Sequence, residues 1–232
     1  ISGRQHAVVI GGGYIGLEVA ASLTKLGLRV DVIEMADRLL ARVASPQISA
    51  FFAELHQSHE VGLHIGANCQ KILQKDGTFT GVQLDDGSQI VAELLLVGIG
   101  VLPDLEMAKS AGIMAGNGIL VDAMMQSSVQ DIFAIGDVAL IDGAALRIES
   151  VDNAQMTAAR AAAAICGLAQ PAMTAPWFWS EQFDVRLQSA GIVPLASPGL
   201  NHQLRPGKRE SGFSVWSYGD NGELAAVEAV RD

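Results

Sequence analysis

The first third of the chain alternates between short apolar runs and a segment with helical spacing. Residues 6–10 (HAVVI) and 28–34 (LRVDVIE) are apolar runs rich in β-branched residues, which predict buried parallel strands. Between them, residues 14–25 carry apolar side chains at the helical period, and Gly27 is placed to end that helix. The pattern therefore predicts a β-α-β unit with a short crossover.

Shorter segments follow this unit. A helix is predicted to begin at Pro46 with Ser45 as its N-cap, and a short strand, VGLHIG, comes after it. Three β-type segments, CQKILQ, TFTGVQL and SQIVAE, are separated by KDG and DDG, which favour hairpin turns. We therefore expect a three-stranded antiparallel meander in place of a second crossover helix. The run LLLVGIG then predicts a buried strand with Gly98 and Gly100 at its carboxyl end.

The pattern changes again after Gly116. The stretch GILVDAMMQSSVQDIFAIGDVAL predicts two short strands, the second ending at Gly136 and Asp137, and a helix follows over about residues 150–166. From residue 171 onward, alternation, aromatic residues and turn signals predict an antiparallel β module. This module is so small that it needs a neighbour to stay folded.

Composition and charge narrow the class of protein. The net charge of −10 argues against a nucleic-acid binder, and no apolar run reaches about 18 residues, so no membrane span is indicated. Cys69 and Cys166 form no C-x-x-C pair; we interpret them as small buried side chains and expect a reducing cytoplasm. The spacing of His56, His59 and His64 does not suit a zinc site.

A glycine-rich turn carries the first candidate chemistry. Residues 11–16 (GGGYIG) fit the pattern G-x-G-x-x-G between a predicted strand and a predicted helix. In such a turn the first glycine allows the tight bend, the second lets the backbone approach a pyrophosphate, and the third lets the helix pack closely on the sheet. The helix start offers N–H groups and a positive dipole end to phosphates. The expected contacts are Gly11, Gly13, Tyr14, Ile15 and Gly16.

Two acidic residues refine this dinucleotide site. Glu34 ends the next predicted strand, where a carboxylate accepts hydrogen bonds from the adenosine ribose 2′-OH and repels a 2′-phosphate. Since residues 35–37 supply no basic side chain, NADH is favoured over NADPH. For Glu18 the residues alone leave two interpretations open: a helix residue stabilised by the helix dipole, or a group near the nicotinamide.

The order of several motifs resembles a known family. The segments VVIGGGYIGLEVAASL, VGIGVLPD, DIFAIGDVA, ESVDNAQMTAARAAA and PWFWSEQ together resemble the FAD-dependent NADH:ferredoxin reductases of Rieske-type aromatic-ring dioxygenase systems. Reductases of rubredoxin and of the ferredoxins of cytochromes P450 look similar. The resemblance covers essentially the whole chain, and PWFWSEQ is specific to this branch of flavoproteins.

The resemblance implies an α/β fold in three parts. Residues 1–116 are similar to the Rossmann-type NADH-binding domain with its three-stranded meander, and residues 117–170 to the second segment of a Rossmann-type FAD-binding domain. Residues 171–232 resemble a C-terminal α+β reductase module that looks truncated. The resemblance also implies that the N-terminal half of the FAD domain is missing, so that the chain is a fragment.

The same resemblance implies roles for individual residues. At the NADH site, it gives the pyrophosphate to the fingerprint glycines and the ribose to Glu34. It places Glu18 beside the nicotinamide, with Gly98 and Gly100 lining that side. For FAD, it gives the ribityl and pyrophosphate region to Asp137, points the start of the helix after Ser150 at the flavin pyrimidine ring, and sets tryptophans near the isoalloxazine; packing of the β module is the alternative for these tryptophans. The FAD candidates are Gly136, Asp137, Ser150, Val151, Trp179 and Trp177.

The implied reaction moves a hydride from NADH to FAD and then single electrons to a small [2Fe–2S] ferredoxin, with no side chain acting as acid, base or nucleophile. Two alternatives stay open: an NADH oxidase or disulfide reductase of the same fold, and a nucleotide-binding fragment without redox activity. We expect the isolated chain to bind NADH, to be colourless and to be inactive. Arg205, Lys208 and Arg209 form either a docking patch for an acidic ferredoxin or a solvated loop.

Overall fold

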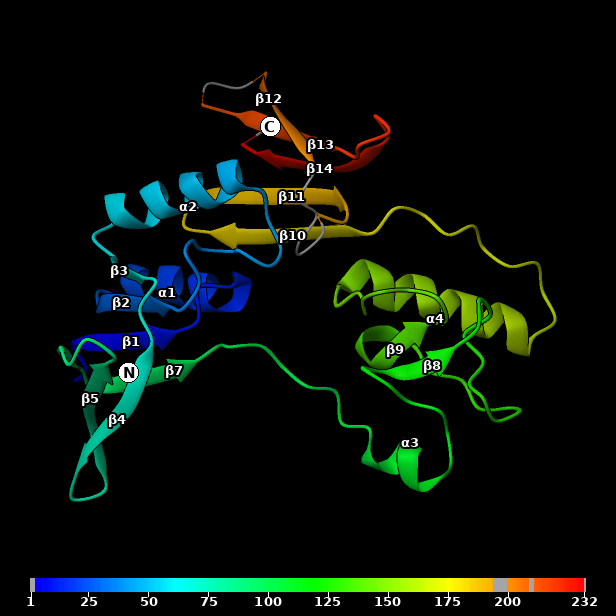
Figure 1. Cartoon of the computed structure of the whole chain (residues 1–232), viewed down its shortest axis with the longest axis horizontal. Helices are drawn as coiled ribbons and strands as arrows, with labels where there is room; N and C mark the ends of the chain where they lie inside the picture. The colour runs from blue at the N-terminus through cyan, green and yellow to red at the C-terminus, as the bar shows by residue number, and fades with distance from the viewer. Residues whose placement is uncertain (1–2, 194–199, 209–210, 232) are drawn as a thin grey trace. The chain divides into compact units, whose positions relative to one another are not determined.

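The computed structural model describes residues 3–193, 200–208 and 211–231. Contacts group the chain into two compact units, shown in Figure 1. Unit 1 comprises Ile1–Gly100 and Trp179–Asp232, and unit 2 comprises Val101–Phe178. The predicted division into three parts rests on resemblance to a family, whereas the two units rest on contacts within the chain. The boundaries of the three parts therefore stay a prediction.

A parallel sheet of four strands forms the centre of the first part of unit 1. Its strands, in spatial order, are β3 (Gly62–Ile65), β2 (Arg29–Glu34), β1 (His6–Ile10) and β7 (Leu94–Val97). Ile10, the last residue of β1, pairs with Ile33 on one side and with Val97 on the other. The carboxyl ends of three parallel strands therefore meet at one edge, as the apolar runs of the sequence predict.

Two helices accompany this sheet. The crossover helix α1 (Tyr14–Lys25) joins β1 to β2 and is followed by Gly27 at φ +84°, which confirms the predicted β-α-β unit. The helix α2 (Pro46–Ser58) begins after Ser45, as predicted. However, the Ser45 side chain makes no capping bond; its backbone N–H donates instead to the Glu228 carboxylate at 3.1 Å.

The predicted meander is confirmed. Its strands β4 (Cys69–Lys75), β5 (Thr78–Leu84) and β6 (Gln89–Val91) form an antiparallel sheet in that order. Gly81 on the central strand has φ +148°, and a Cβ there would lie 2.3 Å from the carbonyl oxygen of Ile90. The strands therefore approach so closely at this point that only glycine fits.

The C-terminal segment forms a second, antiparallel sheet. Its strands, in spatial order, are β10 (Trp177–Gln182), β11 (Val185–Gly191), β14 (Leu224–Val230), β13 (Phe213–Tyr218) and β12 (Asn201–Pro206). All elements of this segment that the structure describes are strands, and the helices near the sheet, α1 and α2, come from the first part of the chain. The prediction of an antiparallel β module is confirmed, whereas the described residues of this segment contain no helix of the α+β module that the resemblance implies.

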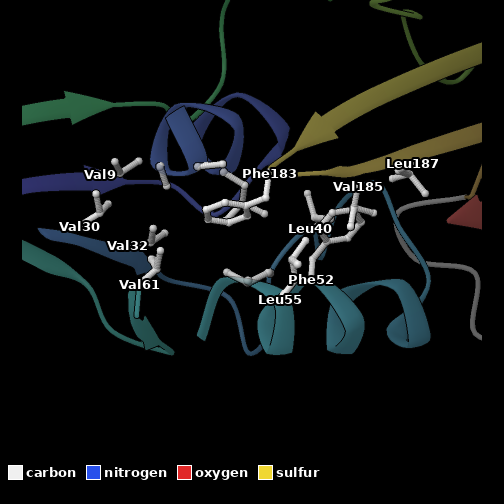
Figure 2. Packing of buried hydrophobic residues seen from close by; sticks show 14 of the residues in the cluster. Val9, Val30, Val32, Leu40, Phe52, Leu55, Val61, Phe183, Val185 and Leu187 are labelled. Atoms are coloured by element: carbon white, nitrogen blue, oxygen red, sulfur yellow. The ribbon is translucent and has the colours of Figure 1, made fainter. Parts of the chain in front are cut away.

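One hydrophobic core joins this sheet to the helices of unit 1. Phe183, Val185 and Leu187 lie in the same buried cluster as Leu40 and Phe52, and Figure 2 shows these side chains lying together. Each is 8% exposed or less, and burying a side chain of this size contributes about 1.5–3 kcal/mol. The helix layer is thus the neighbour that so small a module requires.

Unit 2 contains fewer regular elements. They are α3 (Glu106–Ser110), β8 (Ile119–Val121), the 3₁₀ turn η1 (Gly136–Val138), β9 (Ala139–Ile141) and α4 (Val151–Ile165). The prediction that the second strand ends at Gly136 and Asp137 is wrong, because β9 begins after these residues and pairs with β8 in parallel. A strand needs a ladder of backbone bonds, whereas Phe133 makes only an isolated bridge to Gln126.

The two cysteines are free thiols, and the prediction that both are buried is wrong. Cys166 is exposed because it is the C-cap of α4, and Cys69 is partly exposed because it begins an edge strand of the meander. Among the described residues, no helix is long and apolar enough to cross a membrane.

Candidate nucleotide-binding site

The glycine-rich turn lies at the carboxyl edge of the parallel sheet. The N–H of Gly11 donates to the carbonyl of Ile33 at 2.8 Å, and the N–H of Gly98 donates to the carbonyl of Ile10 at 2.7 Å. These bonds continue the sheet by one residue beyond β1 and β7. The structure therefore brings Gly11 and Gly98, which lie far apart in sequence, into contact at this edge.

The three fingerprint glycines have different surroundings. Gly11 has φ +107°, and a Cβ there would lie 2.3 Å from the carbonyl oxygen of Gly98. A Cβ at Gly16 would lie 2.0 Å from the carbonyl oxygen of Gly11, so α1 could not pack so close to the turn. A Cβ at Gly13 would meet nothing within 4 Å. Gly11 and Gly16 are thus required by the fold, whereas Gly13 leaves space that a ligand can use.

The start of α1 has neither a capping side chain nor an acidic residue among the described residues. Gly13 is the N-cap, no side chain of the described residues caps the helix, and no acidic residue lies in its first turn. The first N–H groups of a helix have no intrahelical acceptor, and they carry the positive end of the helix dipole. Ile15 is 63% exposed, whereas Tyr14 is partly buried and packs against the core. Burial, with the charges of Glu228 and Glu18, raises the pKa of Tyr14.

Glu34 is bound directly to the turn. Its Oε2 accepts a hydrogen bond from the Gly12 N–H at 2.6 Å, and its Oε1 accepts one from the Ala36 N–H at 2.7 Å. These bonds fix the carboxylate at the end of β2, a structural role that sequence reasoning missed. The nearby Arg38 donates to the carbonyls of Ala41 and Ala44, so its guanidinium serves the loop after β2.

Glu18 forms a hydrogen bond with a residue far away in the sequence. The hydroxyl of Ser180, on β10, donates to Oε1 of Glu18 at 2.6 Å. This bond joins the helix of the fingerprint to the motif PWFWSEQ. The motif itself was the only signal for Ser180, because spacing along the chain says nothing about a contact between such distant segments.

Gly98 and Gly100 follow β7 at the same edge. A Cβ at Gly98 would lie 3.6 Å from the Cα of Gly16, which is ordinary contact. Gly100 has φ +106°, and a Cβ there would lie 3.7 Å from Nη1 of the exposed Arg42. Arg42 brings a positive charge to this edge, and sequence reasoning missed it because it lies in the irregular loop after β2.

The FAD candidates of unit 2 surround a second tight turn. Gly136 is buried at φ +66°, its N–H donates to Oγ1 of Thr157 on α4 at 2.9 Å, and Asp137 beside it is exposed. Ser150 is the N-cap of α4, and its Oγ accepts the N–H of Asn153 at 3.1 Å. Val151, the first helical residue, is 53% exposed. The turn and α4 are thus joined by a direct hydrogen bond.

The two candidate tryptophans belong to different units. Trp177, in unit 2, donates its backbone N–H to Oδ2 of Asp152 in the first turn of α4 at 3.3 Å. Trp179, in unit 1, has the Arg186 guanidinium 6.0 Å from the centroid of its ring. Both side chains are partly buried. Their place beside a flavin stays a prediction.

The histidines serve separate hydrogen bonds. Nε2 of His6 lies 2.6 Å from Oδ2 of Asp31, and Nε2 of His64 lies 2.7 Å from Oδ1, distances that leave no room for an ion. Burial raises the pKa of Asp31, but the bonds from His64 and His6 outweigh it and hold that pKa below its ordinary value. His56 instead bonds Gln182. No group of three metal-binding side chains is present among the described residues.

The basic segment near the C-terminus is only partly a loop. Arg205 lies on β12, where its guanidinium stacks 3.9 Å from the Trp216 ring centroid and donates to the Tyr218 hydroxyl at 3.0 Å. Lys208 is exposed after the strand, and Arg209 lies outside the described residues. Whether this segment docks a partner stays a prediction.

Comparison with known proteins places this geometry in a family. Residues 2–158 match the family model described as pyridine nucleotide-disulphide oxidoreductase. The chain belongs to this family. A second model, described as reductase C-terminal, matches residues 177–232, which begin with β10.

Ferredoxin reductases are among the relatives of this chain. It is 43% identical to the ferredoxin reductase subunit of the 5,5'-dehydrodivanillate O-demethylase of Sphingobium, over 98% of this chain and 56% of that protein. A ferredoxin reductase from Rhodopseudomonas palustris has the same fold, with a TM-score of 0.90 and 40% identity over 98% of this chain and 56% of that one. The reductase in a covalent putidaredoxin reductase–putidaredoxin complex gives a TM-score of 0.90, 36% identity and coverage of 98% and 55%. The chain thus spans about half the length of these relatives, and the predicted resemblance is confirmed.

Proposed function

We propose that this chain is the nucleotide-binding part of an FAD-dependent NADH:ferredoxin oxidoreductase of an oxygenase system. The single observation that carries the proposal is the start of α1, where an open glycine position and uncapped N–H groups face the edge formed by three strand ends. When bound, NADH supplies a hydride that FAD takes up and passes on as single electrons to a [2Fe–2S] ferredoxin.

The residues of the turn fit the pyrophosphate of NADH. A ligand oxygen can approach the Gly13 backbone because no protein atom fills the position of its Cβ. No side chain of the described residues caps the start of α1, and the positive end of the helix dipole there favours such an oxygen. The exposed Arg42 beside Gly100 adds a positive charge for the same phosphates.

Glu34 favours NADH over NADPH. Its carboxylate is already oriented by the N–H groups of Gly12 and Ala36, and each oxygen keeps a further lone pair for the 2′- and 3′-hydroxyls of the ribose. A 2′-phosphate at the same place would meet the negative charge of Glu34, and the guanidinium of Arg38, four residues further on, is engaged with backbone carbonyls.

Unit 2 offers part of an FAD site. The exposed Asp137 carboxylate can accept hydrogen bonds from the ribityl hydroxyls, and Gly136 gives it a tight turn. The start of α4 would stabilise negative charge on the flavin pyrimidine ring through the helix dipole. These few groups make a partial site, and we propose that the isolated chain binds NADH without retaining FAD. The compartment we propose is the reducing cytoplasm, in keeping with two free thiols.

Calorimetric titration of the chain tests the nucleotide site. We expect NADH and ADP-ribose to bind, and NADPH to bind much more weakly. Glu34→Arg should weaken NADH binding at least tenfold by reversing the charge at the ribose. Unchanged NADH affinity in this variant, or failure of both NADH and ADP-ribose to bind the unaltered chain, would overturn the proposal. Flavin absorbance in the purified chain would refute the prediction that it is colourless.

The ferredoxin step needs a protein that contains this chain together with the rest of the FAD site. We expect it to reduce a small [2Fe–2S] ferredoxin with NADH. Fast NADH-dependent reduction of a disulfide or of dioxygen, with no ferredoxin reduced, would instead favour the NADH oxidase or disulfide reductase interpretation.

A further inference from the structure

The hydroxyl of Ser180 connects α1 with the C-terminal sheet. Ser180 is 1% exposed, and its Oγ lies 2.6 Å from Oε1 of Glu18. The bond is part-buried, because Glu18 is partly exposed, and a hydrogen bond to a carboxylate in such a place contributes more than one between neutral groups. Through it, the second half of unit 1 holds a side chain that lies one turn into the nucleotide-binding helix.

The contact between Ser180 and Glu18 continues into the core. Nε2 of Gln182 lies 3.1 Å from Oγ of Ser180, and Oε1 of Gln182 lies 2.9 Å from Nε2 of His56 on α2. Ser180 and Gln182 share one face of β10 because strand residues alternate. Gln182 and His56 are fully buried. Four side chains from α1, β10 and α2 thus form one continuous hydrogen-bond chain.

The groups at the two ends of this hydrogen-bond chain fix which atom donates and which accepts in each of its bonds. A carboxylate only accepts hydrogen bonds, so the Ser180 hydroxyl must donate to Glu18 and accept from the amide of Gln182. The carbonyl of Gln182 then faces His56, which must donate from Nε2. Nδ1 of His56 is buried without a partner among the described residues, and burial lowers the pKa of His56. A neutral Nε2–H imidazole therefore ends the chain and keeps the Ser180 proton directed at Glu18.

We infer that Ser180, Gln182 and His56 are positioning residues that fix the Glu18 carboxylate for the nicotinamide end of NADH. The inference rests on the proposed NADH site. Ser180 holds Oε1 of Glu18, and the carboxylate keeps further lone pairs with which it can accept hydrogen bonds from a ligand. A free glutamate side chain loses rotamer entropy when it orders against a ligand, whereas this one is ordered before the ligand arrives. We therefore expect the positioning of Glu18 to affect binding of the nicotinamide half of NADH and not of the ADP-ribose half.

The test compares NADH with ADP-ribose, which lacks the nicotinamide riboside, by calorimetry on the whole chain. Ser180→Ala should raise the Kd for NADH roughly tenfold and change that for ADP-ribose by less than about twofold. Ser180→Thr keeps the hydroxyl and should recover most of the NADH affinity. Ser189→Ala, which removes another buried hydroxyl from the neighbouring strand β11, should leave both affinities unchanged.

A second variant guards against loss of folding in the first. Gln182→Met keeps the volume but removes both central hydrogen bonds, so it should weaken NADH binding in the same direction and by less than Ser180→Ala. Equal losses for NADH and ADP-ribose, or no loss in either variant, would overturn the positioning role while leaving the nucleotide site in place. Failure of the unaltered chain to bind ADP-ribose would instead overturn the site itself.

Discussion

Two helices begin beside a glycine turn, and their first turns differ. Helix α1 starts after Gly13 with no capping side chain and no acid in its first turn, among the described residues. Helix α4 starts after Ser150, whose hydroxyl accepts the N–H of Asn153, and Asp152 in its first turn accepts the N–H of Trp177. Among the described residues, the start of α1 thus lacks both a capping side chain and an acid, whereas the start of α4 has both, so the dipole of α4 is only partly available to a ligand.

This difference suits the start of α1 to binding a ligand and the start of α4 to supporting the fold. A helix start without caps is less stable by about 1 kcal/mol than a capped one, a cost that a bound anion removes. The α1 turn therefore depends on a phosphate in a way that the start of α4 does not. It also explains why we propose that the chain holds NADH while its FAD half-site, built around α4, does not hold a flavin.

The largest effect is expected from Gly16→Ala. The new methyl group would lie 2.0 Å from the carbonyl oxygen of Gly11, so helix and turn must separate. We expect the free energy of unfolding to fall by about 3 kcal/mol and NADH binding to be lost, as measured by urea unfolding and calorimetry. A variant as stable as the unaltered chain would show that the close packing of α1 is not required.

Gly13→Ser should give α1 a serine cap like that of α4 and so remove the difference between the two helix starts. Nothing lies within 4 Å of the position of the new Cβ, and serine is a favourable N-cap. We expect unfolding free energy to rise by about 0.5–1 kcal/mol while NADH binding weakens at least tenfold, because the hydroxyl competes for the phosphate donors. Stability and affinity changing in the same direction would contradict this account.

Ser150→Ala should make the start of α4 more like that of α1. Loss of the cap is expected to destabilise unit 2 by about 1 kcal/mol. The NADH affinity of unit 1 should stay the same. Hydrogen exchange should become faster at the α4 amides and stay unchanged at the α1 amides, relative to the unaltered chain. Exchange at the α1 amides that is faster in the variant than in the unaltered chain would contradict this expectation.

The smallest effect is expected at Asp31 on β2, which is bonded to His6 and His64. The lowered pKa of Asp31 implies a contribution to stability that is present above its unfolded pKa of about 3.9 and is lost as pH falls through the lower folded value. Asp31→Asn should abolish that loss below about pH 4 without affecting NADH binding at neutral pH. An unaltered acid transition in urea unfolding would exclude Asp31 as its cause.

Local patterns predicted the parts of the fold that depend on neighbours in sequence. The β-α-β unit, the meander and the end of α1 at Gly27 all follow from periodicity and turn residues. The strand predicted to end at Gly136 failed because a strand depends on a partner that its own residues do not specify. The exposure of Cys166 likewise depends on where α4 meets the surface, which composition does not reveal.

The site was predictable in its backbone and unpredictable in its long-range contacts. The roles of Gly11 and Gly16 in the tight turn follow from the motif, since each needs only the adjoining strand and helix. The bonds of Glu18 with Ser180 and of Ser45 with Glu228 join residues more than 160 positions apart. Such pairs depend on how two sheets pack, and a single sequence carries no local sign of them.

The core shared by the two ends of unit 1 has a consequence for synthesis on the ribosome. Val230 on β14 and Leu187 on β11 complete the cluster that buries Phe52 of α2. At about 5–20 residues per second, on the order of ten seconds separate the emergence of Gly100 from that of Val230. During that interval the apolar faces of α1 and α2 lack their cover and are open to chaperones or to other nascent chains. The nucleotide-binding half therefore completes its core only after the C-terminal sheet has been synthesised.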